Sequence, residues 1–93
     1  MRSQKPSVKL EDWAVVPSVN HGQYQELRPG HLLVGRAFGH HRIKSGSFIF
    51  TSPIVSVDLQ NNIVETRNTS YQLGEASHEY KRWSKEQAST TAA

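Results

Sequence analysis

The chain has 93 residues, no cysteine and a formal net charge of +3, and its mean hydropathy is −0.61. A chain of this length builds one domain with one modest core, which disfavours enzymes that need a deep substrate cleft. The lack of cysteine excludes disulfides and thiolate chemistry, and no apolar run reaches the roughly 20 residues of a membrane span. Because the N-terminus is polar and basic, without the apolar segment of a secretory signal, we expect a cytoplasmic protein with no membrane association.

The N-terminal part predicts a tail, one short element and two turns. Residues 1–8 are polar and contain Pro6, so we expect them to form a flexible tail. Residues 10–16 fit either a short strand or a helical turn, and Pro17 ends the element in both cases. The sequences Asn-His-Gly at 20–22 and Arg-Pro-Gly at 28–30 are typical of turns.

The middle of the chain predicts strands. Residues 31–38 (HLLVGRAF) form an expected strand, in which Gly35 indicates a bulge or a close backbone approach. Residues 39–46 are polar and bounded by glycines, which favours a loop or a short ribbon. Residues 47–59 show the strongest strand pattern of the chain. Because Pro53 lacks an N–H group, this segment is either two strands or one sharply bent strand.

The segment 60–73 completes a predicted hairpin. Residues 60–62 (Gln-Asn-Asn) indicate a turn, and residues 63–68 return as the partner strand. We expect residues 69–73 to continue this strand with Tyr71 and Leu73 on one face, until Gly74 stops it.

Residues 75–87 predict a helix, because Ala76, Tyr80, Trp83 and Gln87 are spaced at i, i+4, i+7 and i+11. Its aromatic residues are expected to dock the helix on the sheet. Residues 88–93 are expected to be a disordered tail. The fold class is therefore mainly β with a C-terminal helix (α+β), as a single domain over residues 9–87. Its sheet is predicted to be small, twisted and antiparallel, or an SH3-like open barrel.

No motif predicts catalysis or a bound metal. Adjacent residues on a strand point to opposite faces, so His40 and His41 could not share an ion there, and residues 27–57 contain no carboxylate. The segment 30–37 lacks the lysine and hydroxyl residue of a phosphate loop. The chain also lacks a nucleophile elbow and an evident carboxylate pair. We therefore expect a non-enzymatic protein without metal or cofactor.

The positive charge is concentrated between residues 27 and 57. The candidate partner-binding residues of this basic window are Arg28, Arg36, His40, His41, Arg42 and Lys44. Such a patch attracts acidic protein surfaces or phosphates. With Phe48, Phe50 or Tyr71 nearby it could also stack bases, and a third interpretation is an ordinary charged surface.

The segment 39–74, which ends in Asn-Thr-Ser-Tyr-Gln-Leu-Gly, resembles small β-rich proteins of bacteria or of mobile elements such as phages and plasmids. The resemblance implies neither an activity nor catalytic residues.

The sequence thus predicts a protein-interaction module, an inhibitor or adaptor of a bacterial factor that binds an acidic protein surface. The alternative is a small nucleic-acid-binding β-barrel that uses residues 28–44. An exposed edge strand would also allow two copies to pair as a homodimer.

Overall fold

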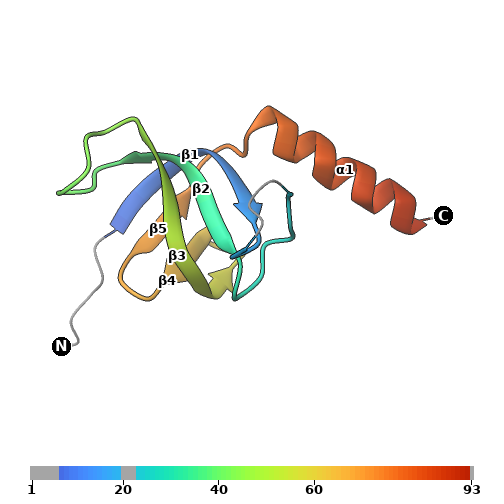
Figure 1. Cartoon of the computed structure of the whole chain (residues 1–93), viewed down its shortest axis with the longest axis horizontal. Helices are drawn as coiled ribbons and strands as arrows, with labels where there is room; N and C mark the ends of the chain where they lie inside the picture. Colours follow the sequence, from blue (N-terminus) through green and yellow to red (C-terminus); the bar gives the residue numbers. More distant parts are fainter. Residues whose placement is uncertain (1–6, 20–22, 93) are drawn as a thin grey trace.

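The computed structural model describes residues 7–19 and 23–92, with side chains up to Gln87. Within these residues the elements are β1 (Ser7–Val16), β2 (Leu32–Phe38), β3 (Ser47–Asp58), β4 (Ile63–Thr66), β5 (Ser70–Leu73) and α1 (His78–Ala92). Figure 1 shows the strands crossing one another in one compact unit, from which α1 leads away. The expected mainly β fold with a C-terminal helix is therefore confirmed.

The sheet closes on itself. Each strand pairs antiparallel with the next, and β1 also pairs with β5, so the five described strands form a closed barrel. The β1–β5 pairing is parallel and aligns Val8 with Tyr71 and Leu10 with Leu73. Successive strands of a meander alternate in direction, so the first and the fifth must run the same way. This closure differs from the open barrel of the sequence prediction, and it pairs the terminal strands that an edge-to-edge homodimer would use.

The barrel interior is filled by small and branched side chains. Leu10, Leu33, Val64 and Thr66 are all less than 2% exposed. The diameter of a barrel grows with its number of strands, so a barrel of only five strands leaves little room inside for aromatic rings. Alternation along β3 therefore turns Ile49 and Thr51 inward and leaves the neighbouring phenylalanines outside.

The first strand is longer than predicted. β1 begins at Ser7, and Val8 is 1% exposed, so the expected tail of residues 1–8 was wrong for these two residues. They are ordered because their backbone pairs with β5, which lies far away in the sequence. Of the two interpretations of residues 10–16 the strand is correct. The predicted turn at 20–22 lies outside the described residues, whereas the turn at 28–30 is confirmed by Gly30, whose φ is 96°.

Residues 47–58 form one bent strand. The register between β2 and β3 shifts between Leu32 and Val34, where the N–H of Leu33 donates to Thr51 Oγ1 at 3.0 Å. This irregularity adjoins Pro53, which pairs with Leu32. A bulge at this point accommodates the missing N–H of proline. Of the two predicted alternatives, two strands or one bent strand, the single strand is therefore correct.

The prediction that residues 69–73 continue the preceding strand was wrong. The chain reverses after Thr66, whose N–H and Oγ1 both donate to the carbonyl oxygen of Thr69, at 2.9 and 3.2 Å. β5 then runs antiparallel to β4 and pairs Ile63 with Gln72. The Thr66 hydroxyl helps to close a turn that contains neither glycine nor proline, and Asn68 within the turn was the usable signal that the prediction passed over.

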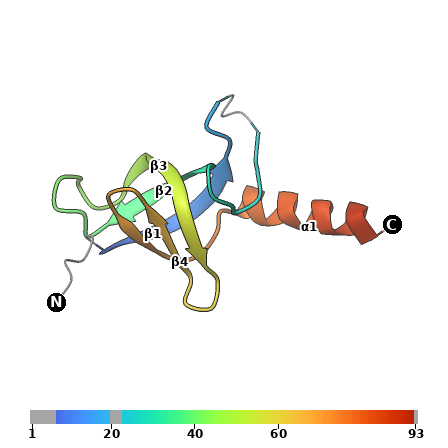
Figure 2. The ribbon, with the colours of Figure 1, turned by 90° about the horizontal axis from the view of Figure 1, so that it is seen from below.

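The helix begins later and ends later than predicted. Ala76 forms a parallel bridge with Trp13, which keeps residues 75 and 76 extended, and Ser77 Oγ accepts the N–H of Tyr80 at 3.2 Å as an N-cap. α1 continues to Ala92, so residues 88–92 are not the disordered tail that was expected. No glycine or proline follows Gly74 to stop it. Figure 2 shows α1 projecting from the barrel, and residues 84–87 are all exposed.

Candidate functional site

The basic window is divided between the two ends of β2. Figures 1 and 2 both place the β2–β3 loop, residues 39–46, at one end of the molecule and α1 at the other. Arg28 precedes β2 and lines a hollow of about 400 Å³ that Trp83 of α1 also lines. Arg36 lies within β2, whereas the remaining four residues of the predicted set belong to the loop. The structure therefore brings together only part of this set.

Carboxylates from outside the window pair with two of its four cations. Arg28 forms an ion pair with Glu26 at 2.7 Å, and Arg36 forms one with Asp12 at 3.5 Å. Glu26 stands just before the window and is a near neighbour of Arg28 in the sequence, whereas Asp12 reaches Arg36 only through the pairing of β1 with β2. Arg42 and Lys44, by contrast, have no ion pair within the described part of the chain.

The β2–β3 loop covers one side of a groove, which we call the loop groove. It has a volume of about 680 Å³. Its walls come from the loop, from β3 and from the region of the β4–β5 turn. The lining residues are His40, His41, Arg42, Ile43, Ile49, Phe50, Thr51, Ser52, Asn68, Thr69 and Tyr71. This lining includes one arginine, two histidines and no carboxylate, so the groove favours an anionic ligand.

The loop is held in one conformation by its own hydrogen bonds. The N–H of Gly39 donates to Ser45 Oγ at 3.3 Å, and the N–H of Arg42 donates to His40 Nδ1 at 3.0 Å. At the end of the loop, the N–H of Gly46 donates to the carbonyl of Ala37 at 2.8 Å. Gly39 and Gly46 have φ values of 88° and 93°, which other residues rarely adopt. A loop ordered in this way loses little conformational entropy when it binds a partner.

The two adjacent histidines lie face to face. Their ring centroids are 5.2 Å apart, and the ring planes differ by 8°. The two side chains would point to opposite faces only if these residues formed a strand. They lie instead in the loop between β2 and β3, which confirms the loop interpretation of residues 39–46. Among the described residues there is no group of three His, Cys, Asp or Glu side chains that could hold a metal ion.

Two exposed phenylalanines extend the loop groove onto the outer face of β3. Phe48 and Phe50 are 55% and 54% exposed, and their rings form an edge-to-face pair at 6.1 Å. Phe48 pairs across the sheet with Arg36. Tyr71, by contrast, is only 5% exposed, and burial raises the pKa of its phenol, so it belongs to the core and is not available to stack bases. Exposed aromatic residues beside arginine are typical of protein-interaction sites.

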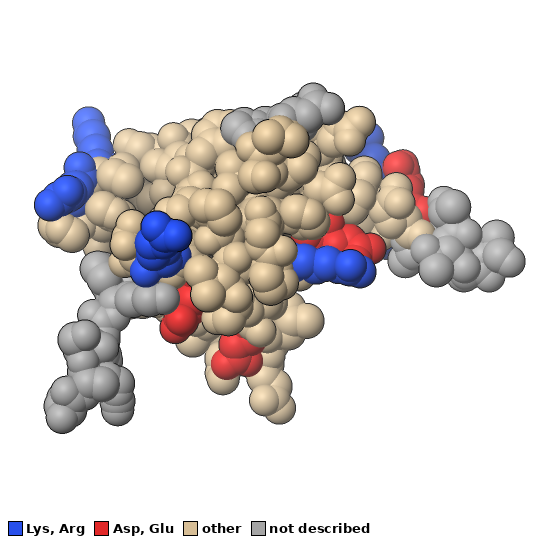
Figure 3. Space-filling view, turned by 60° about the horizontal axis from the view of Figure 1, so that its bottom comes forward, with Lys and Arg blue, Asp and Glu red and all other residues tan. Residues whose placement is uncertain are grey.

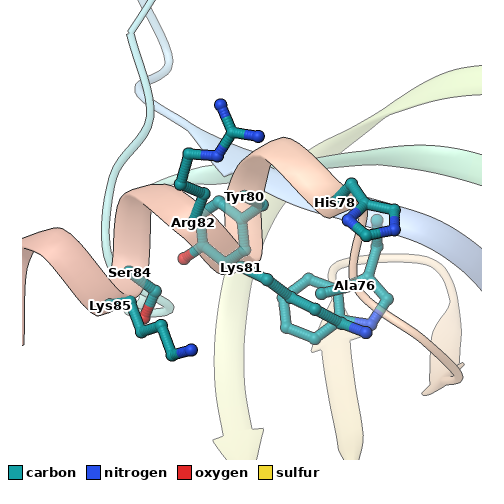
Figure 4. A pocket seen from close by; sticks show the side chains of 8 residues that line it. Ala76, His78, Tyr80, Lys81, Arg82, Ser84 and Lys85 are labelled. Atoms are coloured by element: carbon teal, nitrogen blue, oxygen red, sulfur yellow. The ribbon is translucent and has the colours of Figure 1, made fainter.

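A second hollow, which we call the helix cleft, lies between α1 and β1. It has a volume of about 770 Å³ and is lined by Trp13, Ala76, His78, Tyr80, Lys81, Arg82, Ser84 and Lys85. Figure 4 shows Arg82 and Lys85 pointing to different sides of α1, so the basic groups surround the cleft and do not converge on one point. Tyr80, which the sequence predicted to dock the helix, packs against Trp13 of β1, with the two ring centroids 5.5 Å apart.

The distribution of charge over the surface is uneven. Figure 3 shows blue groups at the end of the molecule farthest from α1, whereas toward α1 red and blue groups lie beside one another. This face carries no continuous basic stripe of the kind that follows a nucleic-acid backbone.

Comparison with known proteins gives no relative: no family model matches the chain, and neither a curated protein nor a solved structure matches it. Within the described residues, no helix has both the length and the apolar character needed to cross a membrane.

Sequence reasoning was incomplete for two features of these surfaces. It named Phe48 and Phe50 as possible stacking residues but could not predict that they point outward, because both faces of β3 carry apolar residues and only the narrow barrel decides which face is inside. The cations of the helix cleft were visible in the sequence at Lys81, Arg82 and Lys85. Their spacing on a helix was a usable signal, but nothing in the sequence placed Trp13 beside them.

Proposed function

We propose that this protein is a non-enzymatic, cytoplasmic interaction module that binds an acidic surface of a bacterial protein through the loop groove. The observation that carries the proposal is the composition of the groove and its surroundings. A hydrogen-bonded loop presents Arg42 and two stacked histidines beside the exposed Phe48–Phe50 pair, and no carboxylate lines the groove. Arginine and large aromatic side chains are enriched among the few residues that dominate the binding energy of protein interfaces.

The role of an inhibitor or adaptor follows from the same features. A small module of this kind acts by occupying a surface of its partner or by joining two partners.

Nucleic acid is the second candidate ligand, because the stacked histidines and the phenylalanine pair offer flat faces for bases. Two observations favour the protein partner over nucleic acid. Arg28 and Arg36 are already paired with carboxylates, and Tyr71 is buried. Few cations therefore remain to neutralise phosphates.

The test is a pull-down from bacterial lysate with three proteins, each with and without nuclease, read by mass spectrometry. The proteins are wild type, Arg42→Glu and the matched control Arg28→Glu, which also reverses one exposed cation but lies before β2, at the opposite end of that strand from the loop. We expect a partner that survives nuclease, is retained by Arg28→Glu and is lost from Arg42→Glu. Partners lost on nuclease treatment, together with binding that weakens steeply with salt, would assign nucleic acid instead. A partner that Arg42→Glu retains at wild-type level would refute the use of the groove.

A further inference from the structure

Trp13 is positioned by a distortion of β1. The register between β1 and β2 shifts between Glu11 and Ala14, and Asp12 has a φ of 52°, in the left-handed region that non-glycine residues rarely occupy. Such bulges turn a side chain out of the regular alternation of a strand and are frequent beside functional sites. Here the bulge directs Trp13 toward α1, where its ring contacts Tyr80.

Two glycines accommodate this bulge. A Cβ atom on Gly35 would lie 2.9 Å from the carbonyl oxygen of Glu11 and 3.0 Å from Trp13 Cα, and a Cβ atom on Gly74 would collide with the carboxylate of Glu11. That carboxylate accepts the N–H of Glu75 at 3.0 Å. Gly35 of β2 thus leaves space for the backbone of the bulge, and Gly74, directly after β5, leaves space for the side chain of Glu11.

The indole of Trp13 is fixed by hydrogen bonds. Its Nε1–H donates to the carbonyl of Gly74 at 3.1 Å, while its backbone carbonyl accepts the N–H of Ser77 at 2.8 Å. The side chain is nevertheless only partly buried and lines the helix cleft. A large apolar surface is therefore held rigidly beside an open hollow, which is the arrangement of an anchor site for a bulky side chain.

The rim of the helix cleft is cationic. It carries His78, Lys81, Arg82 and Lys85, and no carboxylate lines it. Lys81 is paired with Glu75 at 2.6 Å, an interaction that lowers the pKa of this carboxyl. Arg82 and Lys85 have no ion pair among the described residues, and both are exposed.

We propose that the helix cleft is a second docking site, which takes an acidic segment of a protein partner with one bulky apolar side chain seated on Trp13. Charge complementarity specifies the acidic flanks, and the apolar floor of Trp13, Ala76 and Tyr80 specifies the anchor. Because Arg82 and Lys85 point to different sides of α1, they match carboxylates spread along a polypeptide better than one compact anion (Figure 4).

A protein segment fits this surface better than a nucleic acid. The same helix carries Glu79 shortly before its cations and Glu86 directly after them, and Glu75 lies just before the helix. A continuous phosphate backbone would meet these carboxylates, whereas a peptide places its acids only where the cations are.

The helix cleft is separate from the loop groove, since the two share no lining residue and α1 and the β2–β3 loop lie at opposite ends of the molecule (Figures 1 and 2). A protein with both sites can hold two partner surfaces at once, as an adaptor does.

The experiment selects peptides from a phage-displayed library of random twelve-residue sequences on the full chain. Selected peptides are then synthesised, and their Kd values are measured by calorimetry on wild type, Arg82→Glu, Lys85→Glu, Arg42→Glu and Arg67→Glu. All four substituted residues are exposed, and each change alters the net charge by the same amount. The Trp83→Phe protein leaves Trp13 as the sole tryptophan, so its fluorescence reports occupation of the helix cleft directly.

We expect selected peptides rich in Asp and Glu around a large apolar residue, with Kd values raised about ten-fold, or about 1.4 kcal/mol, by Arg82→Glu or Lys85→Glu. Arg42→Glu and Arg67→Glu should leave these values within about two-fold, and the Trp13 emission should shift to the blue as water leaves the cleft.

Peptides that bind Arg82→Glu and Lys85→Glu as tightly as wild type would overturn the inference, as would a selection that retains no acidic sequence. Peptides that lose affinity only with Arg42→Glu would overturn it too, while supporting the loop groove. Peptides that lose affinity with Arg82→Glu and Lys85→Glu but not with Arg42→Glu would support the helix cleft and would not bear on the loop groove. Tighter binding of a ten-residue thymidine oligonucleotide than of any selected peptide would replace the peptide by nucleic acid.

Discussion

Replacement of Gly35 by alanine tests whether the β1 bulge requires a residue without a side chain at this position of β2. The added methyl group would lie 2.9 Å from the carbonyl oxygen of Glu11, 3.0 Å from Trp13 Cα and 3.1 Å from Leu10 Cγ. Two of these neighbours are backbone atoms of the bulge, which cannot move aside by a change of rotamer. Because the bulge carries Trp13, the substitution should both destabilise the protein and displace this side chain.

The expected change in the free energy of unfolding combines three effects. Overpacking of a closely packed position costs about 1–3 kcal/mol. The φ of Gly35, 159°, is one that residues with a Cβ atom rarely adopt, and this backbone strain costs about 1–3 kcal/mol more. Replacing glycine by alanine also restricts the unfolded chain, which returns about 0.4–1 kcal/mol. The net destabilisation is about 2–4 kcal/mol, which lowers the Tm by roughly 10–30 °C in a domain of this size.

The assay combines urea denaturation with the fluorescence of Trp13 in the Trp83→Phe background. The control is Gly30→Ala, at a position with no atom within 4 Å of the new methyl group but with a φ of 96°. The control should lose stability through backbone strain while leaving the Trp13 emission maximum unchanged. A Gly35→Ala protein with wild-type stability and unchanged Trp13 emission would show that the bulge tolerates a side chain here and that this reasoning is wrong.

Three further predictions follow from the contacts of Tyr80, Ser77 and the phenylalanine pair. Burial and the nearby Glu26 raise the pKa of Tyr80 to about 12, above its ordinary value of 10 in an unfolded chain, and its hydroxyl donates to the carbonyl of Gln25 at 2.6 Å. The folded state therefore holds this proton more tightly than the unfolded state does. In urea titrations the free energy of unfolding should be constant below pH 10 and fall by up to about 2–3 kcal/mol as the pH rises toward 12. Tyr80→Phe should reduce this decrease. Ser77→Ala removes the acceptor of the Tyr80 N–H and should lower the free energy of unfolding by about 1 kcal/mol. Ser77→Asp, which is another good N-cap, should retain most of the stability. Equal losses in both variants would contradict the role of Ser77 as an N-cap. Phe48→Ser with Phe50→Ser should change stability by less than about 1 kcal/mol, because both rings are more than half exposed, yet weaken partner capture through the loop groove at least ten-fold; unchanged capture would remove the pair from the site.

The interaction surfaces depended on tertiary structure even where their residues were predicted. The basic window identified Arg42, His40 and His41 correctly as neighbours because they adjoin one another in one loop. It also grouped Arg28 with them, although Arg28 lies at the other end of β2 and is paired with Glu26. Residues that are close in the sequence can therefore lie at opposite ends of the barrel when a whole strand runs between them.

The fold class and most elements could be predicted from the sequence because they depend on local physics. Alternation of apolar residues predicted β3, Gly30 and Asn62 marked turns where φ is positive, and the spacing of Tyr80 and Trp83 predicted the docking stripe of α1. These signals act over a few residues, so one sequence without relatives suffices to detect them.

Only the tertiary structure decided the closure of the barrel, the start of β1 at Ser7 and the position of Trp13. Each of these depends on contacts between residues that are far apart in the chain, such as the pairing of Val8 with Tyr71 and the bridge from Trp13 to Ala76. Local propensity carries no information on such pairings, because their free energy arises from burial and backbone hydrogen bonds that exist only once distant strands have met.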